Sequence, residues 1–168
     1  MFRLFRKTQP SGQTSGQTVF TLLSPLAGDA VPIEQVPDAT FADKILGGGI
    51  ALIPESGVLL APADGIISSV PDTFHAVMMT TDFGAELLMH IGIDTVELKG
   101  QHYRALVSDG ERVRTGQPLI EFDRPAIEDA GYAVITPVVI TNSDEFRIRQ
   151  AYAGLMREGA PLLELVKQ

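Results

Sequence analysis

Two of the three histidines in this chain, His75 and His90, flank a segment that predicts a β-hairpin. Two apolar runs lie on either side of a short polar break that ends in Gly84. Asp82 and Gly84 favour a tight reversal, because Asp can bond its own backbone and Gly accepts positive φ. With Asp82 and Phe83 at the loop tip, the two histidines lie directly opposite each other, with Cβ atoms roughly 5 Å apart. A bulge at Gly84 would shift the pairing by one residue and make the contact diagonal.

Three kinds of site could use two facing imidazoles. In the first, His90 is a nucleophile that takes and releases a phosphoryl group, while His75 donates a hydrogen bond to the phosphoryl oxygens. Thr73 precedes His75 by two residues, so a strand would place it on the same face, where it could fix the tautomer of His75. In the second, the pair binds zinc with Asp94 as a third ligand, although no His-x-His or His-Glu-x-x-His pattern supports this. In the third, the histidines are structural.

A partner-binding surface around the histidines is also consistent with the sequence. Apolar side chains near the pair could exclude water from a transfer step, and carboxylates could form an acidic rim for a basic partner. The ordinary alternative is that the apolar residues are core and the carboxylates are solvated surface. The apolar candidates are Phe41, Met89, Ile91, Ile93 and Val96, and the acidic candidates are Asp38, Asp43, Asp94 and Glu97.

Length and composition indicate one domain of 168 residues with a sizeable core. The net charge of −8 argues against nucleic acid, and the lack of cysteine excludes disulfides and thiolate zinc sites. No apolar run approaches the roughly 20 residues of a membrane-spanning helix, and no signal peptide is evident, so we expect a cytoplasmic protein. Residues 1–18 are predicted to be a flexible basic segment and linker, and 19–168 the domain. Residues 1–7 are basic and partly apolar, so the alternative to a disordered terminus is a weak contact with anionic lipid.

The expected fold is all-β, with a few short helical turns. The 16 glycines and 11 prolines suit many short strands. Residues 24–29 resemble 61–66, and residues 113–122 resemble 156–165, which indicates a duplicated antiparallel β-sandwich or barrel. Strands are predicted at 19–23, 50–54, 57–60, 65–70, 76–80, 86–91, 119–122, 134–140 and 162–166, and helical pieces near 38–45, 125–130 and 143–146.

Several segments resemble one known family. Residues 84–96, GAELLMHIGIDTV, resemble the phosphorylation-site signature of the glucose-type enzyme IIA of the bacterial phosphoenolpyruvate-dependent sugar phosphotransferase system. Further blocks follow in the family's order, so the resemblance covers about residues 19–166. These blocks are VPD at 36–38 with Phe41, KILGGGIA at 44–51, PADG at 62–65, FHA at 74–76 and TPVVITN at 136–142.

The resemblance implies a fold and a set of roles. The fold would be an antiparallel β-sandwich of the duplicated hybrid-motif type. The phosphorylated histidine would be His90, its supporting histidine His75, and the threonine that bonds the latter Thr73. No cofactor is expected, although in some members the unphosphorylated form regulates other proteins, and zinc held by His75 and His90 in such a complex is consistent with the resemblance. The partner-binding face would include Asp38, Phe41, Asp94 and Val96.

The resemblance also implies partners. The chain would accept a phosphoryl group from the histidine-containing phosphocarrier protein and pass it to the cysteine of a IIB domain of a membrane sugar permease. His102 and Tyr103 stand where the family often has Gly and Phe, so His102 is expected to be a surface loop residue outside the site. Thr80 replaces an acidic residue of some members, and Gly131 and Tyr132 resemble members fused to permeases, some specific for N-acetylglucosamine. The sugar, glucose or N-acetylglucosamine, stays open, as do two rival functions, a zinc hydrolase and a regulator that carries no phosphate.

Overall fold

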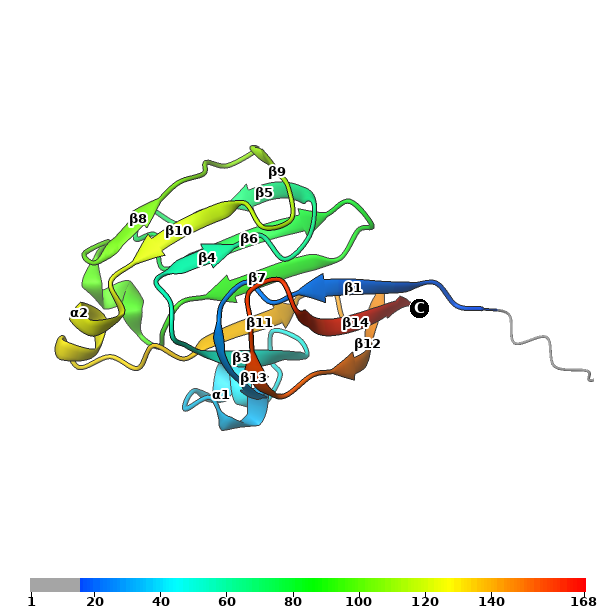
Figure 1. The fold of residues 1–168 in the computed structure, drawn as a ribbon, viewed down its shortest axis with the longest axis horizontal. Coiled ribbons are helices and arrows are strands. Elements are labelled where there is room, and N and C mark those ends of the chain that lie inside the picture. The colour runs from blue at the N-terminus through cyan, green and yellow to red at the C-terminus, as the bar shows by residue number, and fades with distance from the viewer. Residues whose placement is uncertain (1–15) are drawn as a thin grey trace, which may run out of the picture.

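The computed structural model describes residues 16–168. The predicted basic segment at 1–7 lies outside the described residues, as does most of the predicted linker. The described chain folds into layered antiparallel sheets with a few short helical turns (Figure 1). These sheets remain open at their edges, so the sandwich that the sequence predicts is confirmed, and the described residues form no closed barrel.

The largest sheet has eight strands in the order β13-β2-β3-β11-β7-β6-β5-β9, and all neighbours pair antiparallel. Its central strand β11 is buried along its whole length, because both faces of the sheet are covered there. The strands of this sheet are β2 (Gly28–Pro32), β3 (Gly49–Pro54), β5 (Gly65–Ser69), β6 (Ala76–Thr81), β7 (Glu86–His90), β9 (Arg112–Val113), β11 (Thr136–Ile140) and β13 (Gly154–Met156).

Two three-stranded sheets complete the sandwich, in the orders β1-β14-β12 and β4-β10-β8. Figure 1 shows β4, β8 and β10 together in one part of the molecule and β1, β12 and β14 beside the C-terminus. Their strands are β1 (Val19–Leu23), β4 (Val58–Leu60), β8 (Tyr103–Ala105), β10 (Pro118–Phe122), β12 (Phe146–Ala151) and β14 (Pro161–Lys167).

Two short α-helices were predicted correctly, and each begins at an aspartate that caps it. The Asp38 carboxylate accepts the Thr40 N–H at the start of α1 (Ala39–Ala42). Asp123 caps α2 (Arg124–Asp129) in the same way. The helix predicted at 143–146 is wrong, because a single turn there leads directly into β12, whose Phe146 is buried. The 3₁₀ turns η1 (Ile33–Gln35) and η2 (Thr95–Leu98) complete the helical elements of the described chain.

The internal repeats identified in the sequence occupy equivalent places in the fold. The Gly159 N–H donates to the Ser24 carbonyl, with a distance of 3.0 Å. The Gly116 N–H donates to the Ala61 carbonyl in the other unit, at 2.8 Å. Ser24 and Ala61 begin the first pair of matching segments, and Gly159 and Gly116 are equivalent turn glycines of the second pair. The same kind of bond therefore occurs at equivalent places in both units, as expected for a duplicated fold.

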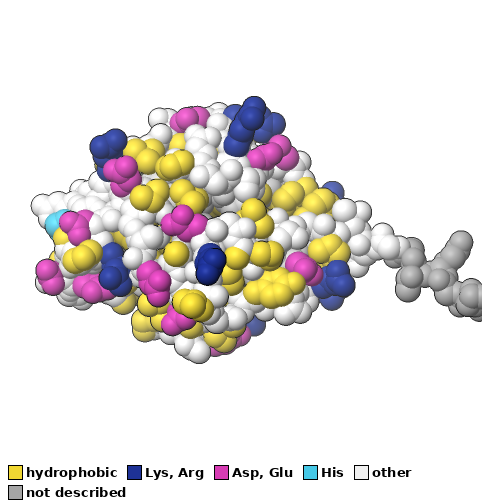
Figure 2. Space-filling view, in the orientation of Figure 1, with side chains coloured by type: hydrophobic (Ala, Val, Ile, Leu, Met, Phe, Trp, Pro, Cys, Tyr) yellow, Lys and Arg dark blue, Asp and Glu magenta, His cyan; other side chains and the backbone are white. Residues whose placement is uncertain are grey.

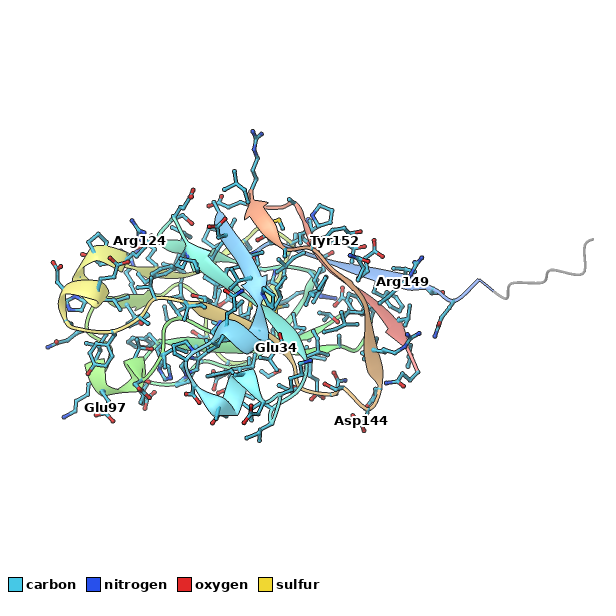
Figure 3. All side chains as sticks on the ribbon, turned by 90° about the horizontal axis from the view of Figure 1, so that it is seen from below. Glu34, Glu97, Arg124, Asp144, Arg149 and Tyr152 are labelled. Atoms are coloured by element: carbon cyan, nitrogen blue, oxygen red, sulfur yellow. The ribbon has the colours of Figure 1, made fainter. Side chains whose placement is uncertain are left out.

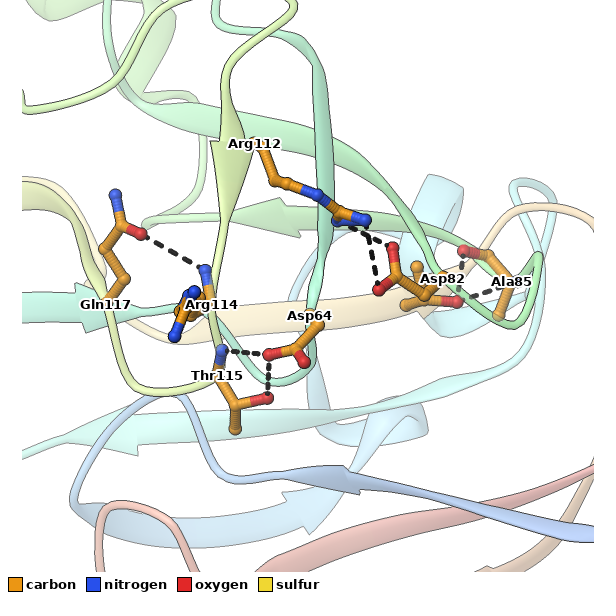
Figure 4. A network of polar contacts seen from close by, with 8 residues as sticks. Asp64, Asp82, Ala85, Arg112, Arg114, Thr115 and Gln117 are labelled. Atoms are coloured by element: carbon orange, nitrogen blue, oxygen red, sulfur yellow. Dashed lines mark hydrogen bonds and ion pairs between the residues drawn. The ribbon is translucent and has the colours of Figure 1, made fainter.

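The tip of the β6–β7 hairpin is tied to neighbouring loops (Figure 4). The Arg112 guanidinium donates to the Asp82 carboxylate at 2.9 Å. Nearby, the Asp64 carboxylate accepts both the backbone N–H and the hydroxyl of Thr115, at 2.7 and 2.9 Å. The Asp64 carbonyl also accepts the Asp82 N–H at 2.9 Å. The loop that sets the hairpin register is therefore fixed by contacts from outside the hairpin.

The sandwich encloses one large core, and a smaller apolar cluster covers the outer face of the large sheet. The large core includes Phe146, Leu87 and Met89, all fully or almost fully buried. The smaller cluster forms where η1 and α1 fold over β3, β7 and β11, and its buried members are Ile33, Val36, Phe41, Ala51, Ile93, Ile135 and Val139.

The surface carries charges of both signs. In Figure 2, Lys and Arg side chains alternate with Asp and Glu side chains, with apolar patches between them. None of the helices in residues 16–168 is both long and apolar enough to span a lipid bilayer.

Candidate functional site: a histidine pair at the end of a hairpin

The β6–β7 hairpin pairs in the shifted register. Ala76, rather than His75, lies opposite His90. At the other end, the Thr81 N–H donates to the Ala85 carbonyl at 2.9 Å, so the loop contains three residues. Gly84 is the last of these and has φ of 98°, a left-handed conformation that glycine adopts without strain. The directly opposed register is therefore wrong, and the diagonal alternative is confirmed.

The two imidazoles meet because both strands end at this point, where the last bond in this register runs from the Ile91 N–H to the His75 carbonyl. In a continued ladder the shifted register would place His75 and His90 on opposite faces of the sheet. However, β6 begins only after His75, and the preceding Phe74 has φ of 54°. The two rings lie with centroids 4.8 Å apart and planes at 80° to each other.

Each imidazole is held through its Nδ1 atom. The Nδ1 atom of His90 lies 2.7 Å from the Gly92 carbonyl oxygen. A carbonyl can only accept, so this nitrogen carries the proton, and Nε2 keeps its lone pair. The Nδ1 atom of His75 lies 2.7 Å from the Thr73 hydroxyl, which confirms that these two side chains meet. No hydrogen bond within residues 16–168 engages Nε2 of either ring.

Burial keeps both imidazoles neutral near pH 7. His75 is 7% exposed, and burial together with the nearby His90 lowers the pKa of His75 from 6.5 to about 4. Burial also lowers the pKa of His90, against the opposing effects of the Gly92 carbonyl and the Asp38 and Asp94 carboxylates. A neutral His90 with its proton on Nδ1 presents a nucleophilic Nε2, which is the state that attack on phosphorus requires.

The apolar wall of the site comes from the smaller cluster. The Phe41 ring on α1 lies with its centroid 5.1 Å from that of His90 and is 5% exposed. Leu88, two residues before His90 and on the same face of β7, packs against this cluster. The predicted proximity of Phe41 to the histidines is confirmed, and the wall shields one side of the imidazole from water.

Three of the residues predicted for the partner-binding face lie at α1 and η2, near His90 or on the surface beside it. Asp38 is half-buried at the start of α1. Asp94 is exposed at the start of η2, where its φ of 60° departs from a strand. Val96 on η2 is 48% exposed. The two carboxylates lie close enough to raise the pKa of His90, and Val96 offers apolar surface to solvent.

The third histidine lies outside the pair. His102 is exposed in the loop before β8 and has φ of 76°. Within residues 16–168, no three His, Asp or Glu side chains are arranged to hold a metal ion, so the pair and Asp94 do not form the three-ligand set weighed from the sequence.

Gly92 is a site residue that the sequence argument did not single out. Its carbonyl fixes the His90 tautomer, and its φ of 86° is left-handed. The only signal in the sequence was a glycine two residues after the histidine within the 84–96 motif.

The fold is that of a known class of protein, the IIA component of sugar permeases. The structure is similar to that of glucose permease IIA from Mycoplasma capricolum, with a TM-score of 0.84 and 27% sequence identity. The similarity covers 88% of this chain and 96% of that one.

Sequence comparison specifies the family. Residues 20–146 match the family model of the phosphoenolpyruvate-dependent sugar phosphotransferase system, EIIA 1, and the chain belongs to this family. The glucose-specific EIIA component of Oceanobacillus iheyensis is 41% identical over 127 residues, which cover 76% of this chain and 77% of the relative. A beta-glucoside-specific EIIBCA component of Dickeya chrysanthemi is 48% identical over 147 residues, 87% of this chain, but the chain spans only 23% of that relative.

Proposed function

We propose that this chain is a phosphohistidine carrier, in which Nε2 of His90 accepts a phosphoryl group from the histidine-containing phosphocarrier protein. The single observation that carries this proposal is the bond from His90 Nδ1 to the Gly92 carbonyl, which leaves the lone pair on Nε2 of a neutral ring. The phosphorus–nitrogen bond of the donor breaks as the bond to His90 Nε2 forms, and the donor imidazole keeps the electron pair. His90 keeps its Nδ1 proton throughout.

His75 and Thr73 are proposed to stabilise the transferred group. If the Thr73 hydroxyl donates to His75 Nδ1, the proton of His75 resides on Nε2, the atom left free to donate to phosphoryl oxygens. One neutral donor stabilises the group less than a cluster of arginines would, so the phosphoryl group stays transferable. The low pKa of His75 supports this role, because a neutral ring can both receive and donate hydrogen bonds at pH 7.

The second half of the proposal is transfer to a IIB domain of a sugar permease. Relatives named EIIBCA and EIICBA components support a IIB partner, because their names join the A component to B and C components. In this step the bond from His90 Nε2 to phosphorus breaks as a bond to the partner's cysteine sulfur forms. The relatives are named for glucose, N-acetylglucosamine and beta-glucosides, so the sugar stays open among these three.

The docking face is proposed to be the apolar and acidic surface beside His90. Phe41 and Val96 supply apolar contact, and Asp38 and Asp94 supply negative charge that favours a basic partner. The unphosphorylated face could also be used for regulatory binding, with His75 and His90 as two zinc ligands completed by the partner. A cytoplasmic location stays a prediction from the sequence.

The test is transfer of label from phosphoenolpyruvate through the two general carrier proteins, followed by mapping of the labelled residue. We expect an acid-labile, base-stable label on His90 and none in His90→Gln. His75→Gln should still accept label but pass it to a IIB domain far more slowly. His102→Gln, which removes an exposed imidazole, is the matched control and should behave as the native chain. A labelled His90→Gln variant, or unimpaired onward transfer by His75→Gln, would contradict the respective role.

A further inference from the structure

The backbone of Ile91, the residue after His90, forms hydrogen bonds through both its N–H and its carbonyl. Its N–H donates to the His75 carbonyl at 2.7 Å. Its carbonyl accepts two hydroxyls, from Thr95 and from Tyr103, each at 2.8 Å. A carbonyl oxygen has two lone pairs, so these two donors fill its capacity, and Ile91 itself is fully buried. The residue after His90 is thus held at every polar atom of its backbone.

The next residue transmits this restraint to the His90 ring. Gly92 supplies the carbonyl that accepts from His90 Nδ1. It packs so closely against Thr95 that an added Cβ would lie 2.5 Å from the threonine methyl carbon. On its far side, the Ile93 N–H donates to the Ala133 carbonyl at 3.1 Å. Because the peptide groups before and after Gly92 are both fixed, the direction of its carbonyl is fixed as well.

Tyr103, one of the two donors to the Ile91 carbonyl, belongs to a different sheet from the hairpin. It is the first residue of β8, which pairs with β10 and not with the hairpin strands. Tyr103 is 8% exposed and belongs to the large core, where its hydroxyl bonds the Ile91 carbonyl and lies beside the Thr95 hydroxyl. Burial raises the pKa of Tyr103 to about 12, so the hydroxyl remains a donor throughout the range in which histidine titrates.

We propose that Tyr103 is a positioning residue for His90: its hydroxyl, together with that of Thr95, fixes the Ile91 carbonyl and so directs the Gly92 carbonyl that holds the proton on His90 Nδ1. This inference rests on the proposed function, since it matters for transfer only if His90 Nε2 is the phosphoryl acceptor. Tyr103 acts on the His90 ring indirectly, through the backbone of residues 91 and 92.

The direct test removes one hydroxyl in the full-length chain. Tyr103→Phe keeps the buried ring and deletes only the donor to Ile91. We expect the ratio of Nδ1–H to Nε2–H tautomers of His90, measured by ¹⁵N NMR of the imidazole, to fall by roughly threefold to tenfold, the effect of one net hydrogen bond. The rate of label transfer from the phosphocarrier protein to His90 should fall by a similar factor.

Tyr152→Phe is the matched control. The Tyr152 hydroxyl donates to the Glu164 carboxylate at 2.7 Å, so this variant also loses a hydroxyl bond of similar length. Tyr152 and Glu97, a residue of η2 beside the site, lie toward opposite sides of the molecule in Figure 3. We expect Tyr152→Phe to leave the His90 tautomer ratio and the transfer rate unchanged.

A second pair of variants serves if Tyr103→Phe fails to fold. Thr95→Val deletes the other donor to Ile91, whereas Thr95→Ser keeps it. The valine variant should shift the His90 tautomer ratio, and the serine variant should restore it toward the native value. A general loss of packing would affect both variants alike, so equal shifts would overturn the proposal.

The outcomes separate this inference from the proposed function. An unchanged His90 tautomer ratio in folded Tyr103→Phe would overturn the positioning role, even if transfer were slower. Absence of label on the native chain would refute the carrier function, while the imidazole spectra would still report whether the hydroxyls position the ring.

Discussion

The low pKa of His75 makes folding stability depend on pH in a way that one substitution should remove. His75 has a pKa of about 4 in the folded protein, against 6.5 for an unperturbed histidine. Between these values the unfolded chain binds a proton that the folded chain does not. The free energy of unfolding therefore falls as pH drops below 6.5, and the loss stops growing once pH passes below the folded pKa.

The size of the effect follows from the two pKa values. Lowering the pH from 7.5 to 5.5 should cost about 1.4 kcal/mol through His75, and lowering it to 4.5 about 2.5 kcal/mol. Part of the lowering of the His75 pKa comes from the charge that His90 carries once it is protonated, so burial alone accounts for less than these amounts. His75→Gln removes the titrating group, so its stability should depend on pH less steeply by up to these amounts.

The assay is urea denaturation of the full chain at several pH values from 7.5 to 4.5. At each pH, the free energy of unfolding of His75→Gln is compared with that of the native chain. The contributions of carboxylates that titrate near pH 4.5 are common to both proteins and cancel in this difference. His102→Gln removes an exposed imidazole and should retain the pH dependence of the native chain. If His75→Gln and the native chain lose stability in parallel, the imidazole is not desolvated as the structure indicates, and the reasoning fails.

Three other substitutions, two of them with a matched control, test the residues that support the site. Gly92→Ala should destabilise the fold by more than about 2 kcal/mol, because its Cβ would lie 2.5 Å from a threonine methyl carbon. Gly131→Ala, also at positive φ but with no atom within 4 Å of an added Cβ, should cost only about 1 kcal/mol in thermal or urea denaturation. Asn142→Ala deletes a buried amide that bonds Gly84 in the hairpin loop and Glu86 at the start of β7, and should cost about 1 to 3 kcal/mol, whereas Thr141→Val, which removes the 3.4 Å bond of a partly exposed hydroxyl, should cost less than about 0.5 kcal/mol; equal losses would contradict this. Thr73→Val removes the hydroxyl that lies 2.7 Å from His75 Nδ1. This variant should pass the phosphoryl group onward more slowly, with the label still on His90. A native rate of onward transfer would refute the role of Thr73.

Strands that form apolar runs bounded by turn residues were predictable from sequence. The segments at 19–23, 50–54, 76–80 and 86–91 match β1, β3, β6 and β7 within about a residue at each end. The strands β2, β8, β9 and β13 were missed, since they are short or contain residues typical of turns, and β12 was missed although it is neither. The sequence GDAVP of β2 begins with glycine and ends with proline, and its strand conformation depends on pairing with β3.

The wrong helix at 143–146 has a similar cause. Asn142 starts a turn, because its carbonyl accepts the N–H groups of Glu145 and Phe146. A helix would continue from such a start, but Phe146 pairs with Lys167 of β14 and buries its ring in the core. Pairing with a strand distant in sequence outweighed the local preference, and no local pattern reports such a partner.

The sequence by itself determined that His75 and His90 would lie at the same end of one hairpin, because a short loop brings the two ends of a hairpin together. It also placed Thr73 beside His75 and identified the family through its motifs. Only the tertiary structure decided the register, since both a two-residue loop and a three-residue loop ending in Gly84 suit the local residues. The contacts that fix the choice come from Asn142 and Arg112, which lie far along the chain. The same holds for the hydroxyl of Tyr103 on the Ile91 carbonyl: such bonds form only after separate sheets have packed, so residue spacing carries no record of them.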